Sequence, residues 1–541
     1  MRRCATRPAT PIFETVRALK LSCLPLAVAL LAAGTAAQRP AEFPIEETTI
    51  AAIHAAMKAG TLTCRALVDS YLRRIDRLDK IGPALNAIVV VNPTAPAEAD
   101  ALDLRFKQGG LTGVLHCIPV IVKDNFETVG LQSAAGSLSL RGFVSSRDAF
   151  QVARLKRAGA IVLAKSNMAE FAFTPYETVS SILPGYTKNP YALDRVTAGS
   201  SGGTAAAVAA NFGAVGLGSD TGNSIRGPAS HQALVGIRST MGLTSRGGVA
   251  PLNLLADIAG PMTRTVEDAA QVLQTIAGPD PADPVTIAES SLARDLSPEG
   301  RPPALPDYRA ALKKDGLKGK RIGVLRQAYE RETTDAEIVA VFMNAVKVLE
   351  AAGAVVVDPA RVELENVRRR PDAGTCGGFK YDLNRWLASH GDTIPMKNLA
   401  AIVQSRQYHP TVQRRLEQSL DASEHGPDTP ACRAEAEYRR QVRAAVVAAM
   451  DAEKLDAFVY PTWSNPPRLI GDLNTPHGDN SQFFSPTTGF PSINVPMGYT
   501  RDGRLPAGLT FFGRAWDEAG LIEVAYAYEQ ATKHRRPPPL N

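Results

Sequence analysis

The sequence predicts an α/β protein in which helices cover both faces of a β-sheet. Residues 118–122 are largely apolar and β-branched, which is typical of a central strand buried on both faces. Residues 148–158 have helical periodicity and are followed by an apolar strand pattern at 160–164. The same order recurs where an Ala-rich helix pattern at 204–211 precedes a short apolar run at 214–218. Repeated helix–strand units build a sheet with helices on both sides.

The segments around these units predict further elements and one loop. Thr63 precedes apolar positions at helical spacing, so we expect it to cap a helix. A strand is expected over 87–91, and a helix over 96–108. Residues 167–171 are expected to begin another helix. Residues 182–195 contain proline, glycine and asparagine and predict a loop.

The second half of the chain predicts more helix–strand units. Helices are expected over 266–276, 335–352, 380–387 and 435–452, and strands over 320–326, 354–357 and 455–462. Residues 278–306 are rich in proline, aspartate and serine and predict a surface excursion rather than a linker between domains. Residues 362–450 contain the fewest recognisable motifs. Helices in such a segment usually cover the core with one face exposed to solvent.

Two serine clusters lie in glycine-rich turns between residues 197 and 228. The first is Gly-Ser-Ser-Gly-Gly at 199–203, and the second is Asp-Thr-Gly-Asn-Ser-Ile-Arg at 220–226. Glycine permits positive φ and close backbone approach, so each turn can present a hydroxyl beside exposed N–H groups. The strand at 214–218 would return the chain so that the second turn lies beside the first. Taken alone, either turn is as compatible with an ordinary turn or a phosphate cradle as with a catalytic loop.

Lys123 ends the buried strand at 118–122. A lysine at a strand end usually turns into water. A buried lysine is instead held neutral by desolvation and can accept a proton, and the two serine turns favour this interpretation here. Asp124 would point to the opposite side of the strand and need not pair with Lys123.

These three features together resemble the amidase signature family, the Ser–cisSer–Lys amide hydrolases. The first turn, the small-residue helix and D-x-G-x-S-I-R-x-P follow the family's spacing, and the family's lysine lies after an apolar strand about 75 residues upstream. The resemblance covers roughly residues 48–535. It implies one large domain, residues 38–541, with a central twisted mixed β-sheet flanked by helices on both faces. Residues 376–403 resemble the peptide-amidase-like branch.

The resemblance also implies a role for each motif residue. Ser224 is the nucleophile that forms an acyl-enzyme, Ser200 is the bridging serine on a cis peptide bond, and Lys123 is the base. The implied oxyanion hole consists of the backbone N–H groups of Thr221, Gly222, Asn223 and Ser224, and the implied supporting residues are Ser201, Asp220 and Arg226. The implied function is hydrolysis of a carboxamide C–N bond to an acid and an amine or ammonia.

Asn223 departs from the family's pattern, which has a glycine at this position. Asparagine tolerates left-handed backbone geometry better than most residues, so we expect the loop to form. Its side chain is expected to add an amide group beside the substrate pocket. The resemblance therefore does not predict which acyl groups this pocket accepts.

Two alternative functions compete with this one. Ser201 formally satisfies G-x-S-x-G, the nucleophile elbow of an α/β-hydrolase-type serine esterase. That mechanism needs a downstream acid and histidine, and it leaves Lys123 and Ser224 unused. The second alternative is the glutaminase subunit of an amidotransferase, which works with partner chains on cytosolic aminoacyl-tRNA. An export signal argues against it.

Residues 1–37 have the pattern of a secretory signal peptide. A basic, acid-poor start precedes an apolar segment at 21–33 and small residues at 34–37, which predicts cleavage after Ala36 or Ala37. The apolar segment is too short to span a bilayer comfortably. We therefore expect a periplasmic or secreted protein without a stable membrane anchor.

The composition and charge of the chain limit which partners and cofactors we expect. Hydrophobic residues make up 45% and charged residues 21% of the chain, which describes a globular protein with a sizeable core. Much of the formal charge of +6 lies in residues 1–37, so no basic face for nucleic acid is expected. We expect a small-molecule or peptide amide as substrate and no cofactor, and the sequence leaves a homodimer open.

Four cysteines lie outside the signal segment, at Cys64, Cys117, Cys376 and Cys432. They permit three pairings, and an oxidising compartment would allow a bridge. They have no CxxC spacing and no histidine at metal-ligand spacing. The pattern favours sparse buried thiols, and no metal site is expected.

Overall fold

The computed structural model describes residues 43–540, apart from 298–299, 301, 303, 369–375, 377, 423 and 425–428. The described residues belong to one folding unit that starts at Phe43. The expected signal peptide, residues 1–37, lies outside the described residues. Within the described part, no helix combines the length and the apolar character needed to cross a bilayer.

An eleven-stranded sheet forms the centre of the unit, in the order β1-β3-β2-β6-β8-β7-β12-β13-β11-β9-β10. It is mixed, because β2 runs parallel to β3 and β6 whereas β8 runs antiparallel to β6 and β7. The strands are β1 (Ile88–Val91), β2 (Pro119–Lys123), β3 (Ile161–Ser166), β6 (Val215–Asp220), β7 (Val235–Arg238), β8 (Ile258–Thr263), β9 (Arg321–Val324), β10 (Val355–Val357), β11 (Ala457–Pro461), β12 (Ser492–Thr500) and β13 (Leu505–Phe512). The expected mixed sheet is confirmed.

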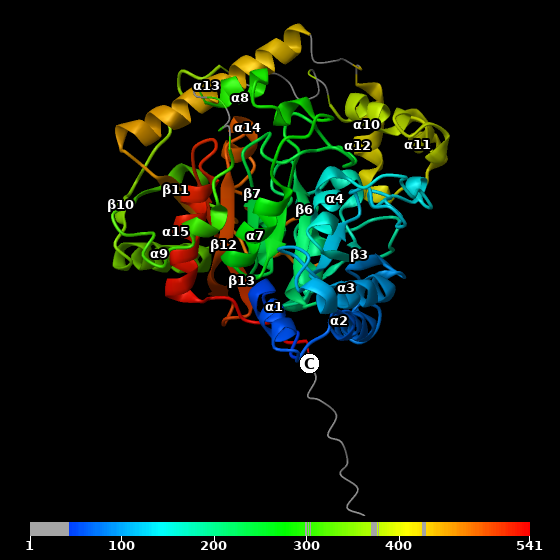
Figure 1. Cartoon of the computed structure of the whole chain (residues 1–541). Helices are drawn as coiled ribbons and strands as arrows, with labels where there is room; N and C mark the ends of the chain where they lie inside the picture. Colours follow the sequence, from blue (N-terminus) through cyan, green and yellow to red (C-terminus); the bar gives the residue numbers. More distant parts are fainter. Residues whose placement is uncertain are drawn as a thin grey trace, which may run out of the picture. The chain divides into compact units, whose positions relative to one another are not determined.

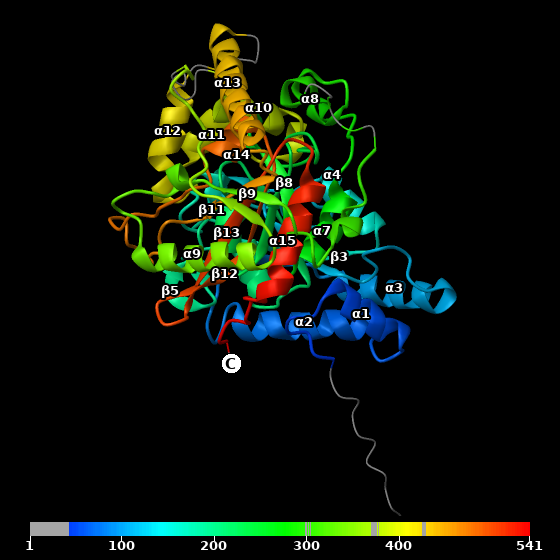
Figure 2. The same cartoon turned by 90° about the vertical axis from the view of Figure 1, so that its left-hand side faces the viewer.

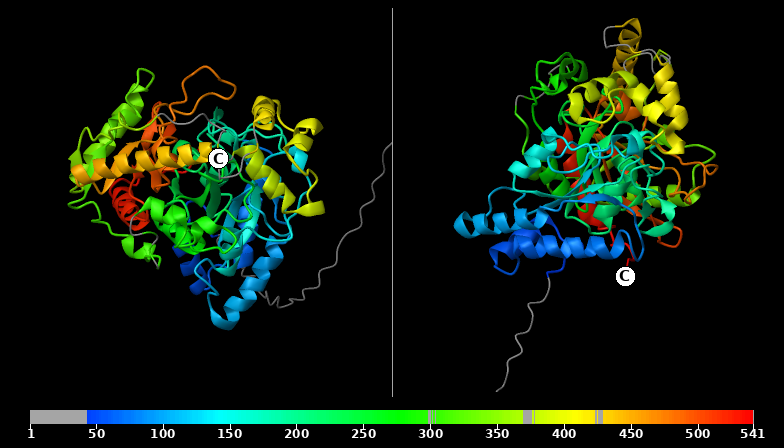
Figure 3. Two further views of the ribbon diagram at one scale, coloured as in Figure 1. Left: turned by 90° about the horizontal axis from the view of Figure 1, so that it is seen from above. Right: turned by 90° about the vertical axis from the view of Figure 1, so that its right-hand side faces the viewer.

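Helices surround the sheet and extend beyond both of its ends (Figures 1 and 2). They are α1 (Ile50–Lys58), α2 (Cys64–Leu78), α3 (Ala95–Gly109), α4 (Phe150–Arg157), α5 (Gly202–Ala209), α6 (Arg226–His231), α7 (Val266–Ile276), α8 (Ser291–Leu296), α9 (Ala336–Ala351), α10 (Phe379–Ala388), α11 (Leu399–Ser405), α12 (Gln413–Asp421), α13 (Pro430–Ala452), α14 (Phe484–Thr488) and α15 (Glu518–Thr532). Helices α5 and α6 pack on the sheet, and so do α7, α9 and α15. Helices α10–α13 gather at one end of the unit, whereas α1 and α2 lie at the other (Figures 1 and 3).

Local signals account for the elements that agree best with the sequence. Thr63 caps α2, since its side chain accepts a hydrogen bond from the Ala66 N–H. Helix α7 spans the expected residues 266–276, and Thr265 caps it in the same way. All residues of α5 are buried, because its alanines and glycines let neighbouring segments approach closely.

Two local expectations are wrong. Residues 167–171 do not begin an α-helix, because the segment makes only a 3-10 turn at Glu170–Ala172 and Phe171 lies at φ 50°. The Glu170 carboxylate holds this turn by accepting hydrogen bonds from Ser181 and from the His409 N–H. The expected loop at 182–195 contains a small hairpin of β4 (Lys188–Asn189) and β5 (Ala192–Val196).

The expectation of sparse buried thiols is also wrong, because the four cysteines form two disulfides. Cys64 pairs with Cys117 at a Cα–Cα distance of 5.5 Å, and Cys376 pairs with Cys432 at 4.5 Å. The partners are 53 and 56 residues apart in the sequence, so only the packing of distant segments brings them together.

Candidate active site

Lys123 is fully buried at the end of β2. Its Nζ donates hydrogen bonds to the Ser200 Oγ at 2.7 Å, the Ser219 Oγ at 2.9 Å and the Ser219 carbonyl oxygen at 3.2 Å. Burial lowers the pKa of Lys123 to about 7, although the negative charges of Asp220 and Asp257 oppose that shift. An amine with this pKa can both accept and return a proton near neutrality.

Asp124 does not neutralise this amine. Its Oδ2 accepts a hydrogen bond from the Gly136 N–H, and its Oδ1 lies 4.0 Å from the Nζ of a second buried lysine, Lys165. The alternation of side chains along an extended strand therefore separates the carboxylate from Lys123, as expected.

The first serine turn is held by close backbone packing. The Gly199–Ser200 peptide bond is cis. A Cβ at Gly199 would overlap the carbonyl oxygen of Glu177, and a Cβ at Gly203 would overlap that of Asn167. Neither glycine has positive φ. The turn therefore requires glycine for close approach and not for left-handed geometry.

The two serine turns lie side by side. The Ser201 N–H donates to the Ser224 carbonyl oxygen at 3.2 Å, and the Ser201 Oγ donates to the Ser219 carbonyl oxygen at 3.1 Å. Ser219 thus contacts both Lys123 and the first turn. Ser219 was not predicted from the sequence, because its only signal is its place before Asp220 at the end of β6.

The second turn opens into a cavity of about 250 Å³. Thr221, Gly222, Asn223 and Ser224 all line this cavity, which we call the Ser224 cavity. Ser224 is only 4% exposed, so the residue itself is largely shielded from solvent. The four residues whose N–H groups the family resemblance assigns to an oxyanion hole therefore face one small space.

A buried ion cluster holds the second turn. The Asp220 carboxylate lies 3.2 Å from the Arg226 Nε and 3.0 Å from the Arg238 Nη1, and all three side chains are fully buried. Asp220 also accepts a hydrogen bond from the Ile225 N–H. Burial raises the pKa of Asp220, but Arg226 and Arg238 outweigh it and bring the value to about 2. Arg238 was not predicted from the sequence, because it lies on β7 outside the motif.

Asn223 differs from its expected geometry. It does not have positive φ, so the loop forms without left-handed backbone at this position. Its side chain packs against Gly227, where a Cβ would overlap the Asn223 amide nitrogen. Both polar atoms of the Asn223 amide are buried without a hydrogen-bond partner among the described residues.

The esterase alternative requires a histidine that hydrogen-bonds to Ser201. His231 instead stacks on Trp463 with ring centroids 4.6 Å apart, and burial lowers its pKa to about 3. Among the described residues, none of the hydrogen bonds of Ser201 involves a histidine. No three His, Cys, Asp or Glu side chains of the described part gather into a group that could hold a metal ion.

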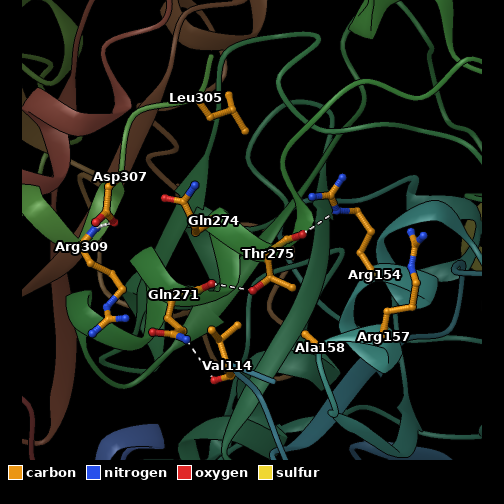
Figure 4. Close-up of a pocket in the computed structure, with 10 residues that line it drawn as sticks. All are labelled: Val114, Arg154, Arg157, Ala158, Gln271, Gln274, Thr275, Leu305, Asp307 and Arg309. Carbon is orange, nitrogen blue, oxygen red and sulfur yellow. Dashed lines mark hydrogen bonds between the residues drawn. The ribbon is translucent and has the colours of Figure 1, made fainter. Parts of the chain in front are cut away.

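A larger cavity of about 660 Å³ lies away from these residues, between α4, α7 and the segment at 305–309. Figure 4 shows Arg154 and Arg157 on one side of it and Arg309 on the other. Arg154 donates to the Thr275 carbonyl oxygen at 2.7 Å. None of the residues predicted from the motifs lines this cavity.

Comparisons with known proteins agree on the family. The family model described as "Amidase" matches residues 66–522. A probable amidase of Arabidopsis thaliana is 33% identical over 94% of this chain and 95% of its own. A glutamyl-tRNA(Gln) amidotransferase subunit of Acinetobacter baumannii is 34% identical over 88% of this chain and 94% of its own. The crystal structure of the peptide amidase from Stenotrophomonas maltophilia matches with a TM-score of 0.81 and 38% identity, covering 92% of this chain and 99% of the other.

Proposed function

The chain belongs to the amidase family and hydrolyses amide C–N bonds, and from that premise we propose that Ser224, Ser200 and Lys123 carry out the reaction. The observation that supports this assignment is the 2.7 Å hydrogen bond from the buried Lys123 amine to the Ser200 hydroxyl, next to a turn that presents Ser224 to a cavity.

An amide carbonyl is a poor electrophile, so the reaction needs an activated nucleophile. The Ser224 Oγ attacks the carbonyl carbon while its proton passes through the Ser200 hydroxyl to the neutral Lys123 amine. A tetrahedral intermediate forms. The C–N bond then breaks, and the proton returns along the same route to the departing amine or ammonia. Water attacks the acyl-enzyme with the same proton transfers and releases the carboxylic acid.

The intermediate carries negative charge on the former carbonyl oxygen, and that charge needs hydrogen-bond donors that are already in place. We assign this role to the backbone N–H groups of residues 221–224. The buried cluster of Asp220, Arg226 and Arg238 supports the turn from behind. Ser201 supports it through the hydrogen bond from its N–H to the Ser224 carbonyl oxygen.

We propose a peptide amide or another small carboxamide as the substrate. The likeness to a peptide amidase over nearly the whole chain supports this class. The glutaminase alternative draws support from the similarity to an amidotransferase component. The two disulfides argue against the glutaminase alternative. Aminoacyl-tRNA is cytosolic, and disulfides are rare in proteins of the reducing cytosol.

We also propose that the protein is exported to the periplasm or secreted, without a stable membrane anchor. The signal-like pattern of residues 1–37 supports this proposal, and the two disulfides are compatible with an oxidising compartment. Whether it acts as a homodimer is tested by light scattering.

The function is tested by incubating the purified protein alone with simple carboxamides, amidated peptides and anilides. We expect at least one class to yield its carboxylic acid and ammonia or amine in equal amounts. Turnover that requires added partner chains would favour the glutaminase alternative. No turnover of any amide, with or without partners, would contradict the proposal.

A further inference from the structure

Part of the wall of the Ser224 cavity comes from the loop that precedes β8. Leu252, Asn253 and Ala256 of this loop line the cavity together with the second serine turn. The proposed reaction uses the turn and assigns no role to the loop. Asp257 ends the loop, directly before β8 begins at Ile258. It is only 7% exposed, so water competes little for its hydrogen bonds.

Both carboxylate oxygens of Asp257 accept hydrogen bonds. The Thr221 Oγ1 donates to the Oδ1 at 2.5 Å, which ties the carboxylate to the second turn. The Oδ2 accepts from the N–H groups of Leu252 at 2.9 Å and Asn253 at 3.0 Å. An amide side chain at this position has only one acceptor atom, so it cannot accept at both places. The carboxylate of Asp257 therefore joins the turn to the loop.

The register of the sheet explains why Asp257 reaches the turn. Strands β6 and β8 are antiparallel, and Asp220 lies opposite Ile258. The turn therefore leaves β6 at the level where Asp257 enters β8. Arg238 on β7 adds a second connection, because it donates to the Asp220 carbonyl oxygen and, through its Nη2, to the Ala256 carbonyl oxygen at 2.8 Å.

The charge of Asp257 also acts on Lys123. Burial lowers the pKa of Lys123, and the negative charges of Asp220 and Asp257 oppose that shift. Burial raises the pKa of Asp257 itself, and its hydrogen bonds from the turn and the loop oppose that rise. Further charged groups around these carboxylates come from several elements, namely Arg226 on α6, Arg238 on β7, Arg246 in the loop after β7 and Asp382 on α10.

We propose that Asp257 is a positioning residue for amide hydrolysis, which fixes Thr221 and the oxyanion turn against the loop at 252–256 and whose negative charge attracts the proton on Lys123. This inference rests on the proposed function. Among the described residues, the hydrogen bonds of Asp257 come from Thr221 and the loop and not from the proposed relay. Asp257 therefore acts through its neighbours.

The test follows the acid limb of the pH profile of kcat/KM with one neutral amide, because this limb reports the base in the free enzyme. Asp257→Asn removes the charge, so its limb should lie about 0.5–1 pH unit below that of wild type. On the plateau, kcat should fall about tenfold or more with little change in KM, since the loss concerns the transition state. A role in folding alone would not move the limb.

Variants of Thr221 separate the geometry of the turn from the charge. Thr221→Val has nearly the same shape without the hydroxyl, so it should lose a similar factor in kcat and keep the wild-type limb. Thr221→Ser retains the hydroxyl that donates to Asp257 and should recover most of the wild-type kcat.

Asp382→Asn is the matched control. The Asp382 Oδ2 accepts a hydrogen bond from the Leu254 N–H at 2.9 Å, so this buried carboxylate holds the same loop from α10. Its hydrogen bond goes to the loop and not to Thr221. The control should keep the wild-type limb and should lose less plateau kcat than Asp257→Asn.

The outcomes separate this inference from the proposed function. An unmoved limb, or a plateau kcat equal to that of wild type, in a folded Asp257→Asn protein would overturn the role of Asp257 and leave the amidase function in place. Wild-type kcat in Thr221→Val would also overturn it. If Asp257→Asn does not fold, the two Thr221 variants decide. Failure of the wild type to cleave any amide would instead contradict the proposed assignment of the catalytic residues.

Discussion

The Lys123 Nζ donates a 2.7 Å hydrogen bond to the Ser200 Oγ across 77 residues of sequence. Both side chains are fully buried, so water does not compete for this contact. The bond joins the end of a central strand to a glycine-rich turn. In the proposed mechanism, Lys123 is the base and receives its proton from Ser200. This hydrogen bond holds the two groups in the orientation that such a proton transfer needs.

The activity should rise with pH through about 7. Burial lowers the pKa of Lys123 to about 7, and only the neutral amine can accept the proton of Ser224. We expect kcat/KM to increase about tenfold per pH unit below this value and to level off above it. Initial rates with one neutral amide between pH 5 and 9 check this. A maximum near pH 5 with loss above neutrality would contradict a lysine base.

Substitution of the proposed relay should abolish turnover without additive losses. Ser224→Ala should lose labelling by a serine-directed fluorophosphonate and about 10⁴-fold or more in kcat, because it lacks the attacking oxygen. Lys123→Ala should lose a comparable amount, and Ser200→Ala the same or somewhat less, since water can partly replace a bridging hydroxyl. The kcat of each double variant should be no lower than that of the least active single variant.

Ser201→Ala is the control for the relay, because the Ser201 hydroxyl hydrogen-bonds only the Ser219 carbonyl oxygen among the described residues. It should still be labelled. If Ser201→Ala blocked labelling while Ser224→Ala formed the adduct, the esterase alternative would replace the proposed mechanism.

Asp220→Asn should strongly destabilise the fold. The change leaves Arg226 and Arg238 buried without their counter-charge, and removing one partner of such a cluster costs about 3–5 kcal/mol. Denaturant unfolding at neutral pH measures this loss. Asp69→Asn removes only a partly exposed helix pair with Arg65 and should cost less than about 1 kcal/mol.

The Asp220 carboxylate also predicts how the free energy of unfolding depends on pH. Its folded pKa of about 2 lies below its ordinary value of 3.8, so the folded state holds the ionised form more strongly than the unfolded chain does. This stabilisation is complete above about pH 4 and is lost as the pH falls towards 2. The free energies of unfolding of wild type and Asp220→Asn should therefore converge in acid. A difference that stays constant down to pH 2 would contradict this account.

The two disulfides and the proposed removal of residues 1–37 together predict how many free thiols the protein has. Protein cleaved after residue 36 or 37 keeps only the four paired cysteines and should show no reactive thiol when denatured without reductant. Uncleaved protein retains Cys4 and Cys23 as well. Replacing Cys64 and Cys117 together by serine should lower the free energy of unfolding by about 2–4 kcal/mol.

Amino-terminal sequencing of protein from the native host completes that experiment and should begin at Gln38 or Ala37. Four reactive thiols in the cleaved protein would contradict both bridges. An intact Met1 in a soluble cytosolic fraction would overturn the proposed export.

The sequence alone determined the features that depend on local chemistry. Helical spacing was enough to place α2 and α7, and a capping threonine marked the start of α2, because these signals act within one or two turns. The motifs named Lys123, Ser200 and Ser224, and they did so because glycine-rich turns and a buried strand leave a readable local pattern. The sheet with helices on both faces followed from repeated helix–strand units, whereas its mixed character followed from the family resemblance.

Tertiary structure decided what surrounds these residues. Arg238 balances Asp220 from β7, and Arg415 reaches the Ser224 cavity from a helix almost two hundred residues further along the chain. The cysteine pairs and the need for glycine at Gly203, which faces the Asn167 carbonyl oxygen, likewise join distant segments. Such contacts depend on which surfaces pack together, and they bury charge and backbone at positions that no local periodicity marks. Local preferences therefore located the groups that we propose to be reactive, whereas long-range packing set their charge balance, their burial and the walls of the cavity.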